Sequence, residues 1–211
     1  MKKAGRAMAT GHGDMIDLLT MSFLLLHGWQ NRRPTGHWQH WLATELRAAG
    51  HEVVHPQLPD PDEPVLDVWL AELRAHVTAL PTGERTVIAH SLSCLLWLHA
   101  AARGAVPARV DRVLLVAPPS PSVTASHPEI DGFAPPTVTA EQFAAAAAET
   151  HLVAADNDPY CPGGAATLYG EPLGIPTTVL SGAAHLDMAA GYGPWPSILT
   201  WSLTGSTLTA G

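Results

Sequence analysis

Short apolar runs alternate with segments of helical periodicity along this chain, beginning at Ser22. The runs are rich in leucine and β-branched residues, which is typical of strands buried on both sides of a parallel sheet. Strands are therefore expected at residues 23–26, 52–55, 86–89, 112–116, 152–155 and 177–180. The alternation predicts an α/β architecture, with a mostly parallel sheet of about six strands and helices on both faces.

Two segments between the expected strands have one apolar face. Residues 38–49 repeat tryptophan, leucine and alanine at helical spacing, and residues 65–80 do the same with leucine, tryptophan and valine, so both are predicted to be amphipathic helices. Residues 118–136 are rich in proline, serine and threonine, whereas residues 139–149 are rich in alanine and begin with Thr139, a suitable N-cap. We expect an irregular excursion followed by a helix, and no second domain.

Composition restricts the class of protein. With 211 residues, of which 46% are hydrophobic and 14% charged, the chain can build one full core and does not resemble a disordered or coiled-coil protein. Nineteen acidic and eleven basic side chains give a formal net charge of −8. This charge repels both nucleic acid and anionic lipid, so neither is an expected partner.

One domain is expected at residues 22–204, preceded by a poorly ordered extension at residues 1–21 and followed by a short tail at residues 205–211. No apolar run reaches the roughly eighteen residues that a membrane span needs, so no membrane association is expected. Two cysteines, Cys94 and Cys161, are too few for a disulfide framework and lack zinc-binding spacing. A reducing, cytoplasmic location is the resulting expectation.

The most informative segment runs from Thr86 to Cys94, where a predicted strand leads directly into a predicted helix with Ser91 at the junction. A serine on such a sharp turn can be exposed as a nucleophile, provided that the residues two before and two after it are small. These are glycines in the common pattern G-x-S-x-G, but here they are Ala89 and Ser93. The segment also fits a serine that merely caps the helix, and on its own it leaves both interpretations open.

A serine becomes nucleophilic when an imidazole removes its proton and a carboxylate orients that imidazole. In folds of this kind the partners follow in the order Ser, Asp, His, at the carboxyl ends of strands. Asp158 follows the strand expected to end at Ala155, and His185 follows the strand expected to end at Leu180. A turn-capping aspartate and a surface histidine are the alternatives for each residue alone, but their joint order favours a triad with Ser91.

Asp156 is the competing carboxylate. It is the first residue to leave the expected strand and can turn its side chain onto local backbone N–H groups. Asp158 precedes Pro159, whose ring favours an extended conformation that projects the carboxylate away from the loop. Asp158 is therefore the residue expected to orient His185.

Attack on a carbonyl creates an oxyanion, which needs two preorganised N–H donors. The backbone N–H of Leu92, directly after the candidate nucleophile, is one candidate. The second is expected in the loop after the first strand, where the pair His27-Gly28 lets the backbone approach a ligand closely. Trp29 N–H is the candidate in that loop, with Gln30 as the neighbouring alternative.

Several short motifs, at the ends of the expected strands and in the loops after them, occur together in the chain. They are Leu26-His27-Gly28, Leu58-Pro59-Asp60-Pro61 followed by Trp69, Ala89-His90-Ser91-Leu92-Ser93, Asp158-Pro159-Tyr160-Cys161-Pro162, and Gly182-Ala183-Ala184-His185 followed by Gly193-Pro194-Trp195-Pro196. With them, residues 22–203 resemble the small serine hydrolase branch of the α/β-hydrolase superfamily, which includes the retinoblastoma-binding serine hydrolase and bacterial relatives. The resemblance implies Ser91 as nucleophile, Asp158 as acid member, His185 as base, and a compact α/β-hydrolase fold without a large cap domain.

A metal site is the competing chemistry. His37 and His40 are three residues apart, and Asp60, Asp62 and Glu63 could supply carboxylates. No third histidine or cysteine stands at ligand spacing, so a solvated helix start beside an acidic loop is favoured and neither a metal nor a cofactor is expected.

The predicted function is a metal-independent serine hydrolase that cleaves small esters, and less readily amides, through an acyl-enzyme. The excursion at residues 118–136 is too short to build a deep acyl tunnel, so short acyl groups are expected to be preferred. An inactive hydrolase-fold protein that acts as a binding module is the alternative, and a lyase is a third possibility, because a fold alone does not determine function.

Overall fold

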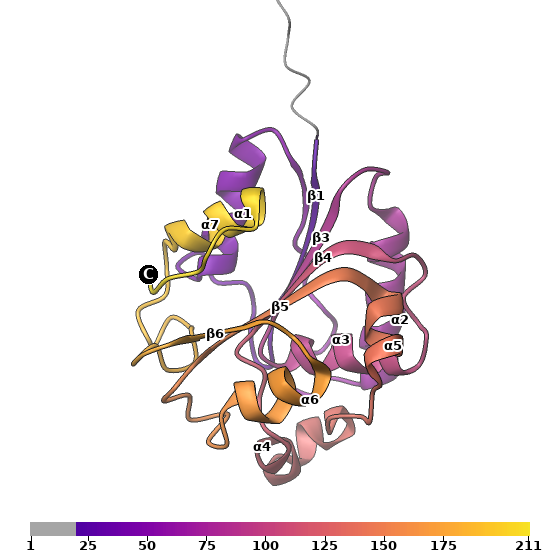
Figure 1. The fold of residues 1–211 in the computed structure, drawn as a ribbon, viewed down its shortest axis with the longest axis vertical. Helices are drawn as coiled ribbons and strands as arrows, with labels where there is room; N and C mark the ends of the chain where they lie inside the picture. Colours follow the sequence, from indigo (N-terminus) through magenta and orange to yellow (C-terminus); the bar gives the residue numbers. More distant parts are fainter. Residues whose placement is uncertain (1–19) are drawn as a thin grey trace, which may run out of the picture.

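A computed structural model describes residues 20–211 of the chain. Its centre is a six-stranded sheet in the order β2-β1-β3-β4-β5-β6, in which every neighbouring pair is parallel (Figure 1). The strands are β1 (Ser22–Leu26), β2 (Glu52–Val54), β3 (Arg85–His90), β4 (Val110–Val116), β5 (Ala147–Ala155) and β6 (Thr177–Leu180). The predicted α/β fold with about six strands is confirmed. Among the described residues, no helix is both long and apolar enough to cross a membrane.

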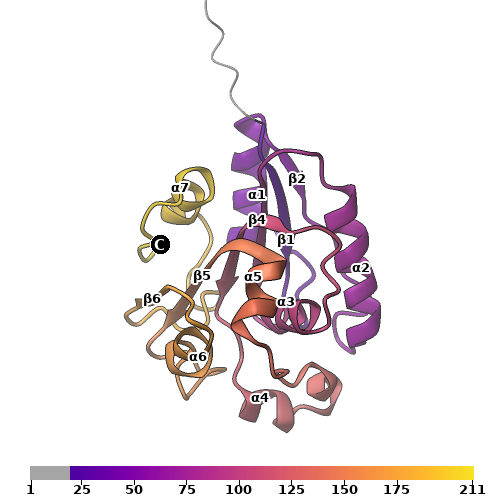
Figure 2. The same ribbon diagram turned by 45° about the vertical axis from the view of Figure 1, so that its right-hand side comes forward.

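Helices cover both faces of the sheet. On one face α1 (Trp38–Ala48) packs beside α7 (Pro196–Thr204), as Figure 1 shows. The other face carries α2 (Leu66–Ala79), α3 (Leu92–Ala102) and α5 (Ala140–Ala146), which are seen together in Figure 2. The core is correspondingly split into two apolar layers, one on each side of the sheet.

The residues of β1 explain why two layers form. Its side chains alternate between the faces, so Phe23 and Leu25 enter the layer under α1, whereas Leu24 and Leu26 enter the layer under α3. All four are fully buried. A strand of this kind stabilises the fold only when both faces are covered, which accounts for the apolar run in the sequence.

Helix α3 lies deepest in the molecule. Ten of its eleven residues are buried. The buried residues lie on every side of the helix and do not form a single apolar stripe. The helix begins immediately after Ser91. The position of that serine is therefore set by the junction of two buried elements, β3 and α3.

The alanine-rich helix predicted at residues 139–149 is shorter than expected. Thr139 does cap α5, in a capping box with Gln142, but the helix ends at Ala146 and Ala147 already belongs to β5. Pairing with β4 explains the difference, since Ala147 lies opposite Val110 in the parallel ladder. Sheet hydrogen bonds override the helix propensity of the alanines.

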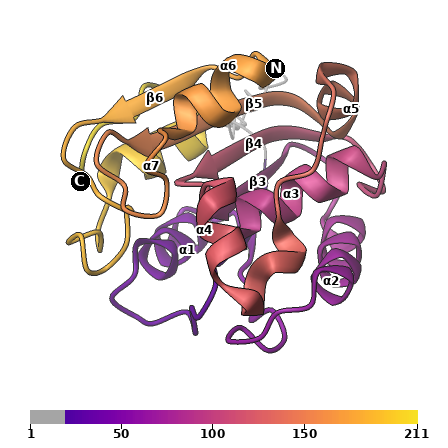
Figure 3. The same ribbon diagram turned by 90° about the horizontal axis from the view of Figure 1, so that it is seen from below.

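The excursion at residues 118–136 contains two short helical pieces. They are α4 (Pro121–Ser126) and the 3₁₀-helix η1 (Pro128–Phe133). In the view from below, α4 crosses in front of the sheet between α1 and α3 (Figure 3).

Between β5 and β6 the chain forms a π-helical turn, η2 (Ala166–Gly170), and the short α6 (Glu171–Leu173). None of these described segments is large enough to be a cap domain.

The two ends of the domain extend the core. The extension expected at residues 1–21 lies outside the described residues, apart from Thr20 and Met21. Met21 is buried, and its N–H donates to Nδ1 of His51 at 3.3 Å. At the other end Leu208 is buried, and the carbonyl of Thr209 accepts a hydrogen bond from the Trp195 indole at 2.7 Å, so the expected tail packs against α7.

Candidate active site

Ser91 occupies a sharp turn between β3 and α3. Its backbone has φ 54° and ψ −121°, a positive-φ conformation that is strained for any residue except glycine. The turn is held by its N–H, which donates to the carbonyl of Val116 at 2.8 Å. Although Ser91 stands at the N-cap position, its hydroxyl makes no capping hydrogen bond. The capping interpretation of this serine is therefore wrong.

The hydroxyl points instead to a histidine from the far end of the chain. Ser91 Oγ lies 2.9 Å from Nε2 of His185, and the other ring nitrogen, Nδ1, lies 3.0 and 2.9 Å from the two carboxylate oxygens of Asp158. Asp158 and His185 are only 4% and 7% exposed. Because a carboxylate can only accept, Nδ1 carries the proton and Nε2 is left to accept from the serine.

Asp156 is engaged elsewhere. One of its carboxylate oxygens accepts from the N–H of Gly182 at 2.8 Å, and the other accepts from the hydroxyl of Ser181 at 2.8 Å. These bonds lower the pKa of Asp156, and the side chain is exposed. The structure brings Asp158, and not Asp156, to the imidazole, as the conformational effect of Pro159 led us to expect.

Hydrogen bonds hold the loop that carries His185, and two of its residues have positive φ. Ala184 and Leu186, on either side of it, both have positive φ, at 46° and 53°. The N–H of Ala184 donates to the side-chain oxygen of Asn157 at 2.8 Å. From behind, Nε2–H of the buried His90 donates to the carbonyl of His185 at 3.1 Å. Burial keeps the pKa of His90 well below its usual value, so the ring stays neutral beside its neighbour.

The loop after β1 passes close to Ser91 at Gly28. A Cβ added to Gly28 would lie 2.8 Å from the Cβ of Ser91, so only glycine fits. The N–H of Gln30 already donates to the carbonyl of Pro61 at 2.8 Å. Within residues 20–211, neither the backbone N–H of Trp29 nor that of Leu92 donates to a protein acceptor, whereas the Trp29 indole N–H donates to the carbonyl of Asp62 at 2.9 Å. Both candidate oxyanion donors are thus available, whereas Gln30 is occupied.

His27 supports this loop in a way that sequence reasoning missed. Its Nδ1–H donates to the carbonyl of Gly28 at 2.8 Å, while Nε2 accepts from the N–H of Leu58 at 2.8 Å. Acceptance at Nε2 requires the neutral ring, and burial lowers the pKa of His27 to about 4. His27 therefore joins the loop after β1 to the loop after β2. The sequence could not reveal this contact, because the partner is thirty-one residues away.

Ser93 accounts for one departure from the glycine pattern. Its hydroxyl donates to the carbonyl of His27, in a bond that is buried. A glycine could not make it. The side chain therefore ties the first turn of α3 to the end of β1, the two elements that carry the candidate nucleophile and the candidate oxyanion donors.

A cavity of about 370 Å³ opens beside Ser91 and His185. The excursion supplies an apolar wall from Pro119, Val123 and Ile130. This volume lies near the lower end of the range for small-molecule sites. Residues 118–136 therefore reach the candidate site and form part of its wall.

His37, a candidate metal ligand, also lines this cavity. Its Nδ1 accepts from the N–H of Gln39 at 3.2 Å and so caps α1, and burial lowers its pKa to about 4. Among residues 20–211 no three histidine, cysteine, aspartate or glutamate side chains are grouped closely enough to hold a metal ion.

Comparison with known proteins identifies the family. The family model described as serine hydrolase matches residues 23–202. The chain belongs to the serine hydrolase family. No curated protein matches it.

Solved structures agree with this assignment at the level of the fold. The ydeN gene product of B. subtilis aligns with a TM-score of 0.75 at 20% identity, covering 89% of this chain and 100% of that one. A ydeN-like hydrolase from Pectobacterium atrosepticum has a TM-score of 0.65 at 23% identity, over 87% and 89% of the two chains. A structure described among the metagenome-derived lipolytic enzymes LipS and LipT has a TM-score of 0.66 at 16% identity, over 89% and 94%. This serine hydrolase therefore has an α/β-hydrolase fold, as its motifs implied.

Proposed function

We propose that this serine hydrolase cleaves small carboxylic esters, and less readily amides, through an acyl-enzyme formed on Ser91. The observation that carries the proposal is the continuous chain of contacts from the Ser91 hydroxyl to His185 and on to the buried Asp158. A lipolytic enzyme among the structural neighbours is consistent with ester chemistry. Within this proposal, Ser91 is the nucleophile, His185 the general base and Asp158 the residue that orients it.

In the first half of the reaction, Ser91 Oγ attacks the carbonyl carbon while its proton passes to Nε2 of His185. The carbonyl oxygen becomes negatively charged and is stabilised by the N–H groups of Leu92 and Trp29. When the tetrahedral intermediate collapses, the bond to the leaving group breaks, and His185 donates the same proton to the departing oxygen or nitrogen. The acyl group remains on Ser91.

In the second half, water replaces the leaving group. The oxygen of a water molecule attacks the acyl carbon while His185 takes a proton from that water. His185 then donates this proton to Ser91 Oγ as the ester bond to the enzyme breaks. The products are a carboxylic acid and the free enzyme. No step requires a metal, so the reaction is proposed to be metal-independent, and a chelator should leave the rate unchanged.

The alternative function, a binding module with an inactive triad, has less support. A buried carboxylate is costly unless it is hydrogen-bonded, and both oxygens of Asp158 are committed to the imidazole of His185. Such an arrangement has an evident use in catalysis and none in the binding of a partner at another surface.

Labelling with a fluorophosphonate probe tests the proposal without requiring knowledge of the substrate. Wild-type protein should be modified at Ser91, whereas Ser91→Ala should not be modified and should lose about a million-fold in turnover of a p-nitrophenyl ester. Ser126→Ala is the matched control, because Ser126 is exposed on α4 and its hydroxyl only bonds the carbonyl of Val123. Modification of another serine would refute the assignment, and an unreactive wild type would favour the binding module.

The size of the cavity predicts the acyl preference. A space of about 370 Å³ must hold both the acyl and the leaving group, so long tails would remain in water and gain no burial energy. We expect kcat/KM to be highest for acetate to butyrate esters and not to rise toward decanoate. A steady rise with chain length would indicate that a longer groove opens in solution.

A further inference from the structure

The ring of Tyr160 lies against the imidazole of His185. The two ring centroids are 4.4 Å apart and the planes are inclined by 51°. Tyr160 also lines the cavity and remains 41% exposed. No step of the proposed reaction uses this residue.

The backbone of Tyr160 is fixed from two directions. Its N–H donates to Oδ1 of Asp158 at 2.8 Å, and its carbonyl accepts from the N–H of Ser120 at 2.8 Å. Ser120 in turn caps α4, which forms the apolar wall of the cavity. The ring is therefore held over the imidazole by the same bonds that orient the carboxylate and the wall.

Only the ring of Tyr160 has a defined partner. Within residues 20–211 its hydroxyl makes no hydrogen bond, so the contact with His185 is made by the aromatic ring and not by the hydroxyl. An aromatic face carries partial negative charge and attracts a cation placed over it. A cation forms at this location whenever His185 accepts the proton of Ser91.

We infer that Tyr160 is a positioning residue for the proposed base, because its ring lies 4.4 Å from the His185 imidazole and stabilises the imidazolium that forms during acyl transfer. The inference rests on the proposed function and deepens it. It assigns to Tyr160 an electrostatic contribution in the transition state, in addition to its place in the cavity wall.

Other groups near His185 remain constant when Tyr160 is changed. They are the carboxylate of Asp158, the neutral rings of His90 and His37, and the carboxylate of Asp187 two residues further along the chain. None of them bonds to the Tyr160 side chain in the described part of the molecule. A change in the behaviour of His185 can therefore be attributed to the substituted ring.

Two substitutions distinguish the effect of the aromatic ring from the effect of side-chain volume. Tyr160→Phe keeps the aromatic face, whereas Tyr160→Leu keeps an apolar cover and removes the face. We expect Tyr160→Phe to match wild type within about twofold, and Tyr160→Leu to lose about three- to tenfold in kcat/KM on a short p-nitrophenyl ester. In Tyr160→Leu the acidic limb of the pH profile should also move about half a pH unit lower, since the protonated imidazole has lost its stabilisation.

The titration of His185 by NMR, with thermal melts to verify folding, completes the test. A midpoint that moves lower in Tyr160→Leu and stays in place in Tyr160→Phe supports the inference. Equal midpoints in all three proteins overturn it, as does a shift shared by Phe and Leu, which would assign the effect to the hydroxyl. Fluorophosphonate labelling of the same samples reports separately on the proposed function, because an unreactive wild type refutes that function whatever the titration gives.

Discussion

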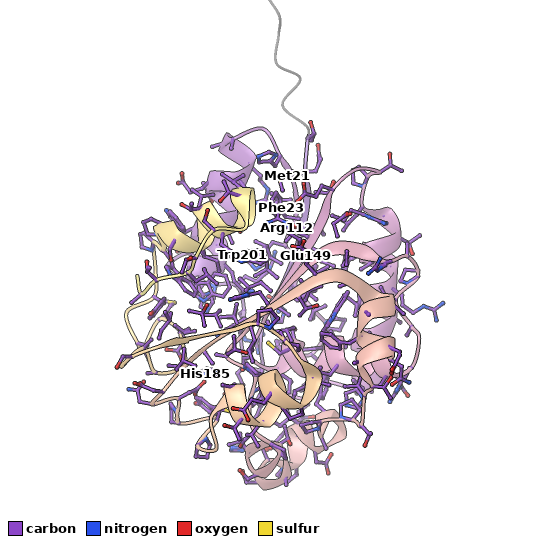
Figure 4. All side chains as sticks on the ribbon, in the orientation of Figure 1. Met21, Phe23, Arg112, Glu149, His185 and Trp201 are labelled. Atoms are coloured by element: carbon purple, nitrogen blue, oxygen red, sulfur yellow. The ribbon has the colours of Figure 1, made fainter. Side chains whose placement is uncertain are left out.

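The two ends of the parallel sheet each carry a cavity, and the cavities are of similar size. The one at the carboxyl ends of the strands, beside His185, measures about 370 Å³, and the one toward the amino ends, beside Arg112 and Trp201, measures about 420 Å³. Figure 4 shows these labelled residues at separate levels of the molecule. Volume does not distinguish the two regions, so the difference must lie in the residues that surround them.

The polar groups around Arg112, at the amino end, bond to one another. The buried guanidinium of Arg112 binds the carboxylate of Glu84 and the carbonyls of Trp201 and Ser202, and it also lies over the Trp201 ring, 5.4 Å from the centroid. The arrangement holds α7 to the sheet, and each of the three guanidinium nitrogens bonds an acceptor within the protein.

The carboxyl end is strained. Seven non-glycine residues among residues 20–211 have positive φ, and all seven follow the carboxyl end of a strand: Gln30, Arg33, Asp60, Ser91, Ala117, Ala184 and Leu186. Backbone strain of this kind costs of order 1–3 kcal/mol per residue and persists where the surrounding structure imposes it, most often at functional sites. Strain together with available N–H donors, and not cavity size, distinguishes the candidate site from the other end of the sheet.

After the loss of Ser91 itself, the largest effect should come from the carboxylate of Asp158, which contacts His185. Asp158→Asn retains the shape of the site but removes the negative charge and allows the wrong tautomer of the imidazole, so kcat should fall about ten-thousand-fold. Asp156→Asn is the matched control, because that carboxylate bonds only Ser181 and Gly182, and kcat should change by less than about tenfold. Both variants should be assayed on one ester across pH, with thermal melts. An inactive Asp156→Asn beside an active Asp158→Asn would reverse the assignment.

The next largest effect should follow from filling the closest approach at the carboxyl end. Gly28→Ala would place a Cβ 2.8 Å from that of Ser91, so the loop must move and carry the Trp29 N–H with it. We expect kcat/KM to fall about a hundredfold or more, mostly in kcat. Gly132→Ala is the control, since an added Cβ there meets nothing within 4 Å, and it should stay within twofold. Similar activities for the two variants would contradict the proposed oxyanion geometry.

Much of the carboxyl end could be predicted from the sequence, because its signals are local. The apolar runs locate the strands, and the carboxyl ends of parallel strands meet at one edge of the sheet. Residues that follow different strands, such as Ser91, Asp158 and His185, are therefore expected close together. Pro159 adds the conformational reason for preferring Asp158 to Asp156.

What the sequence could not predict depends on distant partners. His27 bonds Leu58, and Ser93 bonds the carbonyl of His27, sixty-six residues earlier in the chain. Neither contact leaves a periodic or spacing signal. The prediction that a helix extends to residue 149 was wrong for the same reason. The strand that begins at Ala147 is specified by its pairing with β4 and not by its own composition.

Acid should destabilise the carboxyl end through its buried histidines. The pKa of His37 is about 4 in the folded protein, against about 6.5 when exposed. Between these values the unfolded chain binds the proton and the folded chain does not, so the free energy of unfolding falls as the pH drops from 6.5 toward 4. His37→Asn retains a helix cap and removes this titration. The free energy of unfolding of this variant should fall less steeply with acid than that of wild type. The two slopes should differ by up to about 1.4 kcal/mol per pH unit.

Urea unfolding measured at several pH values between 7 and 4.5 tests this directly. The activity of His37→Asn at neutral pH should remain within several-fold of wild type, because His37 lines the cavity without contacting Ser91. Parallel stability curves for the two proteins would show that the ring of His37 takes no part in acid unfolding.

The smallest effect on turnover should come from the amino end, although its cost in stability is considerable. Arg112→Met removes the buried guanidinium and leaves the carbonyls of Trp201 and Ser202 without their donor, so the free energy of unfolding should fall by about 2–4 kcal/mol. Arg109→Met, at an exposed arginine that bonds one carbonyl, should cost less than about 1 kcal/mol. At a temperature where both variants are folded, kcat should stay within twofold of wild type, because neither arginine contacts the strained loops. A tenfold loss of kcat in folded Arg112→Met would mean that the two ends of the sheet are mechanically coupled, and the contrast between a structural end and a chemical end would no longer hold.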